Sequence, residues 1–183
     1  MVSTLPANQW HLSEEGRLRC QVLAQKLAIY QLDVIVSSIE PKAIETAQLL
    51  ASHLGKPLEV AGGLHEHDRS KVGFLEKERF EAAVAHFFSH PEALVLGNET
   101  ADQAHRRFSQ GVAGVLARYP SANVALITHG TVMSLFVSRL TALEPFSLWK
   151  QLGLPSWIIL SHPGFELMGV IKSIDGDDAR AVV

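Results

Sequence analysis

A strand, a turn and a helix are predicted for residues 123–143, and this unit constrains the fold more than any other stretch. The run from Val124 to Ile127 is apolar without polar alternation, which is typical of a parallel strand covered on both faces. His129 follows this run, and Gly130 opens a mostly apolar stretch with helical spacing. A buried strand that leads into a buried helix favours an α/β fold with a parallel sheet.

The junction between this strand and its helix is a candidate anion site. Ligands of open α/β sheets bind beyond the carboxyl ends of the strands, where the first N–H groups of the next helix are unpaired and carry partial positive charge. We expect Gly130 to adopt backbone angles that a larger residue resists and to let a ligand approach the main chain. His129 could supply a donor or a proton to a bound anion, or could instead satisfy a loop carbonyl.

A second strand, turn and helix are predicted upstream. Residues 33–38 form an apolar run with a polar end, and Pro41 and Gly55 suit the first turn and the C-terminal cap of the following helix. Lys42 lies in the first turn of that helix, where the helix dipole disfavours a cation unless a negative group is nearby. Lys42 is therefore either a candidate anion-binding side chain or a solvated surface lysine.

The other helices and strands are predicted from apolar periodicity and turn residues. Ser13 suits the start of a helix to about Tyr30, with Leu18, Val22, Leu23 and Leu27 as its apolar positions. Further helices are expected over 75–90, 101–119 and 146–152, strands over 57–60, 157–160 and 165–171, and an exposed or frayed tail over 175–183.

Composition and charge narrow the class of protein. The 183 residues, with 47% hydrophobic residues and no repeat or flexible linker, predict a single domain over residues 1–183. The net charge is −3 and Lys and Arg are scattered, so nucleic acid is not expected as a partner. No apolar stretch approaches the roughly 20 residues that span a bilayer, and no secretory signal is seen. We expect a cytoplasmic protein without a membrane partner, and the oligomeric state stays open.

Metal and nucleotide sites have little support in the sequence. Cys20 is the only cysteine, which excludes an internal disulfide and a zinc site built from cysteines. His65 and His67 would point apart in a strand, and no helical H-x-x-x-H pair accompanies them, so no metal is expected. A Rossmann-like nucleotide binder is disfavoured because neither G-x-G-x-x-G nor G-x-x-x-x-G-K-S/T occurs.

Four short motifs follow one another along the chain. They are L-S-E-E-G-R from Leu12, S-S-I-E-P-K-A-I-E-T-A over Ser37 to Ala47, L-H-E over Leu64 to Glu66, and T-H-G over Thr128 to Gly130. Their order and spacing over about 12–170 resemble the histidine phosphatase family, also called phosphoglycerate-mutase-like. The resemblance implies a three-layer α/β/α sandwich with a mainly parallel sheet.

The resemblance also implies site residues. In that family a histidine of an R-H-G motif, at the end of the first strand, attacks a phosphoryl group, while arginines and a second histidine hold its oxygens. A glutamate or aspartate protonates the leaving oxygen. His129 matches the second histidine, Glu66 matches the acid, and Lys42 occupies the place of the second phosphate-binding arginine. Gly130, within T-H-G, is expected to contribute to substrate binding, and no cofactor is implied.

Two departures from the family pattern bear on activity. Lys42 is a point charge without the planar fork that grips two phosphate oxygens, so it should orient the ligand less well. No R-H-G motif precedes Leu12, and His11 does not end an apolar strand, so it is a poor substitute. We therefore expect the fold of this chain to lack the first strand and its nucleophile.

Two functions remain open at this point. One is a phosphatase that hydrolyses a small phosphomonoester through a phosphohistidine, provided that the nucleophile strand exists upstream. A hydrolase is favoured over a mutase because the chain is shorter than typical mutases. The other is a catalytically inactive protein of the same fold that binds inorganic phosphate or an interaction partner.

Overall fold

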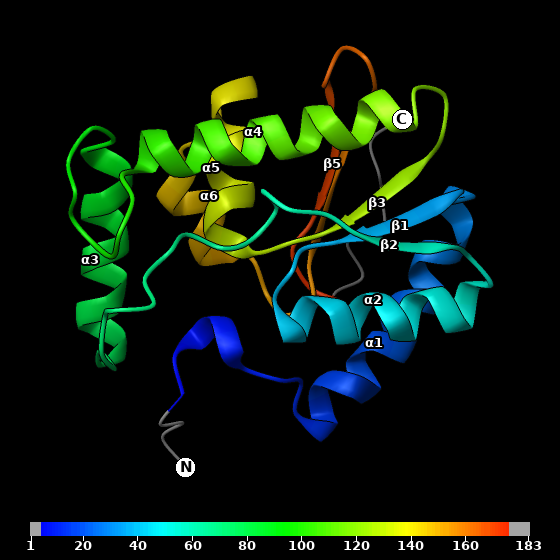
Figure 1. Cartoon of the computed structure of the whole chain (residues 1–183), viewed down its shortest axis with the longest axis horizontal. Helices are drawn as coiled ribbons and strands as arrows, with labels where there is room; N and C mark the ends of the chain where they lie inside the picture. Colours follow the sequence, from blue (N-terminus) through cyan, green and yellow to red (C-terminus); the bar gives the residue numbers. More distant parts are fainter. Residues whose placement is uncertain (1–4, 176–183) are drawn as a thin grey trace.

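The computed structural model describes residues 5–175 and shows a mixed α/β fold around a parallel sheet (Figure 1). The sheet has the order β2-β1-β3, with both pairings parallel. Its strands are β1 (Val34–Ser37), β2 (Leu58–Val60) and β3 (Val124–Ile127). Strands β4 (Trp157–Leu160) and β5 (Leu167–Ile171) form a separate antiparallel hairpin.

Helices lie on both sides of this sheet, as the α/β/α prediction requires (Figure 1). They are α1 (Glu14–Leu27), α2 (Pro41–Leu54), α3 (Lys77–Ser89), α4 (Ala101–Arg118), α5 (Gly130–Leu140) and α6 (Pro145–Gln151), with short 3₁₀ turns at Ala7–Gln9 and Ala28–Tyr30. Every predicted helix and strand is found within a few residues of its expected bounds. Residues 176–183 of the predicted tail lie outside the described residues. Between residues 5 and 175, no helix has both the length and the apolarity needed to cross a membrane.

Side chains of β1 are buried on both faces, which explains why its sequence has no polar alternation. Val34 and Val36 pack in a core shared with α3, α4 and α5. Ile35 packs on the opposite face, in a core shared with α1 and α2. Strand β3 alternates in the same way between the two cores. The two-layer covering is the reason that a continuous apolar run was the correct signal for these strands.

Helix ends follow the predicted signals. The Ser13 side chain accepts a hydrogen bond from the Gly16 amide at the start of α1. Pro41 begins α2, and Gly55 ends it with a φ of 61°, a left-handed conformation that glycine adopts readily.

The predicted core face of α1 is only partly correct. Leu23 and Leu27 are buried, but Leu18 is 58% exposed and Val22 is 40% exposed. The buried face also contains Cys20 and Ala24. With about 3.6 residues per turn, Leu18 and Val22 fall on the side of the helix opposite to these residues. Two apolar stripes were present, and only packing against the sheet decided which one is buried.

One edge of β3 is open. β3 is hydrogen-bonded to β1 on one side, and within residues 5–175 no strand pairs with its other edge. The β4-β5 hairpin forms its own sheet and does not continue the parallel one. Backbone N–H and C=O groups along an unpaired edge are available to another strand, and the expectation that the fold lacks a first strand stays a prediction.

His67 is a buried histidine that packs beside Phe87 of α3. It is 2% exposed, and its ring lies 4.1 Å from the ring of Phe87. Its Nε2 lies 3.1 Å from the carbonyl oxygen of Glu99, so this nitrogen carries the proton, while Nδ1 has no hydrogen-bond partner among the described residues. Burial lowers the pKa of His67 below its usual range, which keeps the ring neutral.

Acidification should therefore destabilise the protein before its carboxylates are protonated. A histidine whose pKa is lowered by folding binds protons more readily in the unfolded chain, so its contribution to stability is complete above about pH 6.5 and is lost as the pH falls below that value. We expect the contribution of His67 to the free energy of unfolding to fall by up to about 1 kcal/mol between about pH 7.5 and 5.5, because one histidine can lose at most ~1.4 kcal/mol per pH unit below its unfolded pKa. Urea unfolding of the protein and of His67→Gln measures this loss, and an equal loss in the variant would contradict the role of His67.

Candidate functional site

His129 lies where β3 ends and α5 begins, in the N-cap position of that helix. Its Nε2 lies 2.7 Å from the Oγ of Ser38, which directly follows β1, and the histidine is 8% exposed. Parallel pairing of β1 with β3 brings these two strand ends to one edge of the sheet. Burial lowers the pKa of His129. The negative charges of Glu66 and Glu40 raise it and the positive charge of Lys42 lowers it, and the net effect is a pKa below the usual range. The ring is therefore neutral near pH 7.

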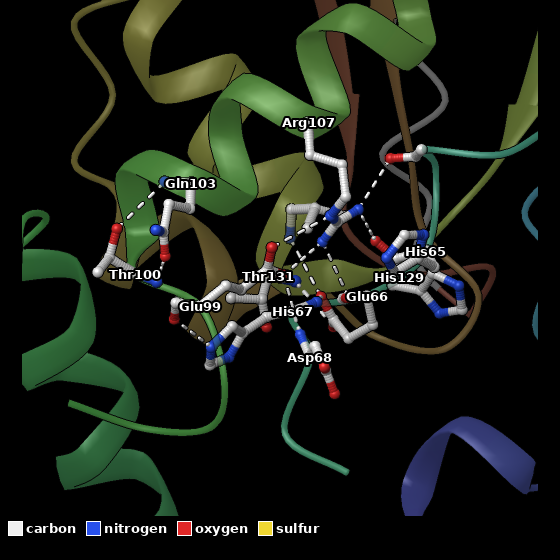
Figure 2. Close-up of polar contacts among 12 residues, drawn as sticks. His65, Glu66, His67, Asp68, Glu99, Thr100, Gln103, Arg107, His129 and Thr131 are labelled. Carbon is white, nitrogen blue, oxygen red and sulfur yellow. Dashed lines mark hydrogen bonds and ion pairs between the residues drawn. The ribbon is translucent and has the colours of Figure 1, made fainter. Parts of the chain in front are cut away.

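Glu66 occupies the N-terminus of α5 (Figure 2). Its carboxylate accepts hydrogen bonds from the backbone N–H groups of Thr131 at 3.1 Å and Val132 at 3.2 Å, and from its neighbour His67 at 2.9 Å. This helix end thus holds a negative group, which is the protein's own side chain, and the binding of an external anion at this junction stays a prediction.

Glu66 is ionised in this arrangement. Burial by itself raises the pKa of Glu66, but the charge of Arg69, the backbone hydrogen bonds from His67 and Thr131, and His129 at the acid pH where its ring is protonated outweigh it, so the pKa lies below its usual range. A carboxylate held in this way accepts hydrogen bonds and does not carry a proton near pH 7.

Arg107 of α4 holds the loop that carries Glu66 (Figure 2). Its Nη1 donates to the carbonyl oxygens of Gly63 and His65, both at 2.8 Å, and its Nη2 donates to that of Glu66 at 3.1 Å. Glu99 pairs with the same guanidinium through an Nε–Oε2 contact of 3.1 Å. This arginine therefore supplies most of the side-chain donors to the loop carbonyls, and the Thr128 hydroxyl adds one to the carbonyl oxygen of Leu64 at 2.8 Å.

Lys42 is paired with an acid of the same turn. Its Nζ donates to the Oε2 of Glu40 and to the carbonyl oxygen of Ala7, both at 2.6 Å. The negative group that a lysine needs in the first turn of a helix is therefore Glu40.

The carboxylate of Glu40 connects the side chains of Lys42 and His129 with the backbone of Glu66. Its Oε1 accepts from the backbone N–H of Glu66 at 2.8 Å and lies 3.6 Å from the Nε2 of His129, while its Oε2 bonds to Lys42. His129, Glu66 and Lys42, far apart in sequence, thus meet at the carboxyl edge of the sheet. Their roles in binding or catalysis stay predictions.

Gly130 lies beside His129, but the conformational reason expected for it is wrong. It is the first residue of α5 and is not among the residues with a positive φ. A methyl group built on it would meet the Trp149 ring at 3.5 Å, which is an ordinary contact. The packing of α6 against α5 therefore does not require glycine at this position. The part of Gly130 in substrate binding stays a prediction.

The other histidines singled out by the sequence differ in their positions. His11 is exposed and hydrogen-bonded to Glu45 of α2, and it does not follow a strand. His65 lies close enough to His129 to influence its pKa. His65 and His67 belong to the loop held by Arg107, and in residues 5–175 no cluster of three or more potential ligands could hold a metal ion.

Sequence reasoning missed Ser38, Glu40 and Arg107. Glu40 had a recognisable signal, because it lies two residues before a lysine whose position calls for a negative neighbour. Ser38 is part of the polar end of the second strand, which also marks the sheet edge. Arg107 had no signal, since its partners are 41 to 44 residues away in sequence.

Solved structures share this fold. A mycobacterial glucosyl-3-phosphoglycerate phosphatase in complex with inorganic phosphate has a TM-score of 0.75 and 23% identity, over 94% of this chain and 93% of that chain. A phosphoserine phosphatase mutant from Entamoeba histolytica in complex with phosphoserine has a TM-score of 0.73 and 19% identity, over 93% and 88%. The alpha-ribazole phosphatase from Shigella flexneri has a TM-score of 0.69 and 19% identity, over 93% and 88%.

At these identities the likeness establishes the fold alone. A search of curated proteins found no match. A family model, described as histidine phosphatase superfamily (branch 1), matches residues 7–165, which is most of the chain. Together with the α/β fold, this match shows that the chain belongs to the histidine phosphatase superfamily.

Proposed function

We propose that His129, Lys42 and the first turn of α5 bind the phosphoryl group of a small phosphomonoester. The observation that carries this proposal is the meeting of His129, Glu66 and Lys42 at one sheet edge in a chain of this superfamily. The names of two structural neighbours, which are phosphatases in complex with inorganic phosphate and with phosphoserine, support a ligand of this kind.

The chemistry of the site suits phosphoryl binding without a metal. Phosphoryl transfer depends mainly on positioning and on neutralising negative charge. Lys42 supplies a full positive charge, and a neutral His129 can donate one hydrogen bond from Nε2. The Gly130 amide, at the start of α5, is a further donor that Glu66 does not occupy.

The proposed reaction is hydrolysis through a phosphohistidine, with Glu66 as the acid. Since Glu66 is ionised near pH 7, it must take up a proton before it can protonate a leaving oxygen. Turnover by this route should therefore weaken as the pH rises through the acid range, because the protonated fraction of Glu66 falls once the pH exceeds its lowered pKa. The nucleophile would belong to an additional strand, for which the open edge of β3 is the natural pairing partner.

The second candidate is a phosphate-binding or interaction protein without catalysis. The observation that favours it is the position of Glu40, whose carboxylate already contacts Lys42 and approaches His129. A site filled in this way can serve recognition without turnover.

Replacement of His129 should weaken phosphate binding. We expect His129→Ala to lower the affinity for inorganic phosphate or vanadate by roughly tenfold or more, because it removes a donor to the anion. Isothermal titration calorimetry measures this, with circular dichroism to show that the fold persists. His53→Ala, an exposed histidine of α2, is the matched control and should bind as the unaltered protein does. Unchanged affinity, or loss of folding, would instead assign His129 a structural role.

Turnover should depend on a nucleophile strand. We expect the 183-residue chain to show no histidine-dependent hydrolysis of an aryl phosphate. A chain extended upstream by a strand ending in Arg-His should hydrolyse it. The reason is that a two-step route needs a nucleophile in line with the leaving oxygen. Both proteins are assayed for acid-labile phosphohistidine, which we expect only in the extended chain.

Two results would change this view. A phosphohistidine at His11 or His129 of the 183-residue chain would show that the missing nucleophile was wrongly inferred. Inactivity of the extended chain would favour the protein without catalysis.

A further inference from the structure

We propose that Glu40 is an internal competitor for the phosphate site, whose carboxylate holds the cationic and histidine side chains in the absence of ligand and limits the affinity for external anions. The inference rests on the proposed function, because it concerns the same site. It assigns Glu40 a specificity role that is distinct from binding or catalysis.

The first step of the argument is the state of Lys42. An ammonium group has three N–H donors, and two of them are directed to the Oε2 of Glu40 and the carbonyl oxygen of Ala7, both at 2.6 Å. The backbone N–H of Lys42 is also bonded, to the carbonyl oxygen of Trp10 at 3.1 Å. One N–H donor of the ammonium group is left, so a phosphate that takes more than one hydrogen bond from this lysine must displace an oxygen of the protein.

The second step concerns His129. Its Nε2, the atom that could donate to a phosphate oxygen, lies 2.7 Å from the Oγ of Ser38 and 3.6 Å from the Oε1 of Glu40. An incoming phosphate oxygen would meet the negative charge of Glu40 at this nitrogen, and like charges at such a separation repel strongly in a poorly solvated site.

The third step is the burial of Glu40 itself. It is 5% exposed, and although it stands at the N-cap of α2, its side chain makes no capping bond to that helix. Its two oxygens are instead satisfied by Lys42 and by the backbone N–H of Glu66. A buried carboxylate requires such partners, so Glu40 and the ligand would compete for the same positive charge.

The charges around Glu40 do not leave an excess for an anion. Glu66 adds a second carboxylate, which is already bound to α5 and is offset by the charge of Arg69, while burial lowers the pKa of both His129 and His65 and keeps these rings neutral. Lys42 is thus the full positive charge in contact with Glu40, and its charge is balanced. Neutralising Glu40 should make the site attract anions.

A purely structural Glu40 is the rival explanation. In that case its bonds only tie the turn after β1 to the loop of Glu66, and its removal would lower stability without raising phosphate affinity. The two explanations differ in the sign of the effect on binding.

Phosphate titrations of charge-neutral variants test the proposal. Glu40→Gln keeps an oxygen for the Glu66 amide but removes the charge, and we expect it to bind inorganic phosphate at least tenfold more tightly than the unaltered protein. The matched control is Glu45→Gln in the same helix, which changes the net charge equally but removes a carboxylate bound to His11 and Arg17. The control should change the affinity by less than about twofold. Calorimetry at constant pH and salt gives both values.

The double variant Glu40→Gln with His129→Ala locates the gain. It should lose the added affinity, and a gain that persists in it would overturn the proposal because the phosphate would bind elsewhere. Equal or weaker binding by Glu40→Gln also overturns it. If that variant does not fold, Glu40→Met, which fills a similar volume without charge, is titrated in its place and judged by the same criterion.

The outcomes separate this inference from the proposed function. Phosphate binding by the unaltered protein that depends on His129 but is unaffected by Glu40→Gln would leave the function standing and remove the competitor. Absence of phosphate binding in every variant would overturn both. Tighter binding by Glu40→Gln without turnover in an extended chain would support the competitor and contradict only the phosphatase.

Discussion

Parallel pairing between β1 and β3 is the interaction on which the site depends. The register aligns Val34 with Val124 and Ser37 with Ile127, and the pairing continues through a bond of 2.9 Å from the Ser38 amide to the carbonyl oxygen of Ile127. Because parallel strands end at the same edge, this register sets the polar end of one strand beside the histidine that follows the other. A shift of one residue would exchange the two buried faces and separate these groups. The core and the site are therefore specified by the same pairing.

The carboxylates of Glu66 and Glu40 have opposite effects at this sheet edge. Glu66 uses the donors of α5 and stabilises the helix end, so its negative charge is favourable for the fold. Glu40 uses Lys42, so its negative charge reduces what the site can offer to an external anion. We proposed a phosphoryl group as the ligand of this site. The positive charge of Lys42, which would attract that ligand, is already neutralised by Glu40. The two carboxylates therefore act on fold stability and on ligand affinity in different ways at the same sheet edge.

The separation of the β4-β5 hairpin from the parallel sheet bears on both candidate functions. β3 keeps one edge without a partner strand in the part of the chain that the structure describes, and an unpaired edge is a place where another strand can add. A strand that added there would end at the same edge as β1 and β3 if it ran parallel to them. Completion of the sheet and completion of the catalytic site would then be one structural event.

The sequence by itself determined the order of helices and strands, their approximate bounds and the edge at which the site lies, because apolar periodicity, caps and turn residues act over a few neighbouring residues. His129, Glu66 and Lys42 could be selected from their motifs. Only the tertiary structure decided which apolar stripe of α1 is buried, because both stripes have helical spacing and burial depends on what packs against them. Only the tertiary structure brought Arg107 to the carbonyl groups of a distant loop and Glu40 between Lys42 and His129. These contacts join segments that no local pattern relates, because their partners come together only when the chain is folded.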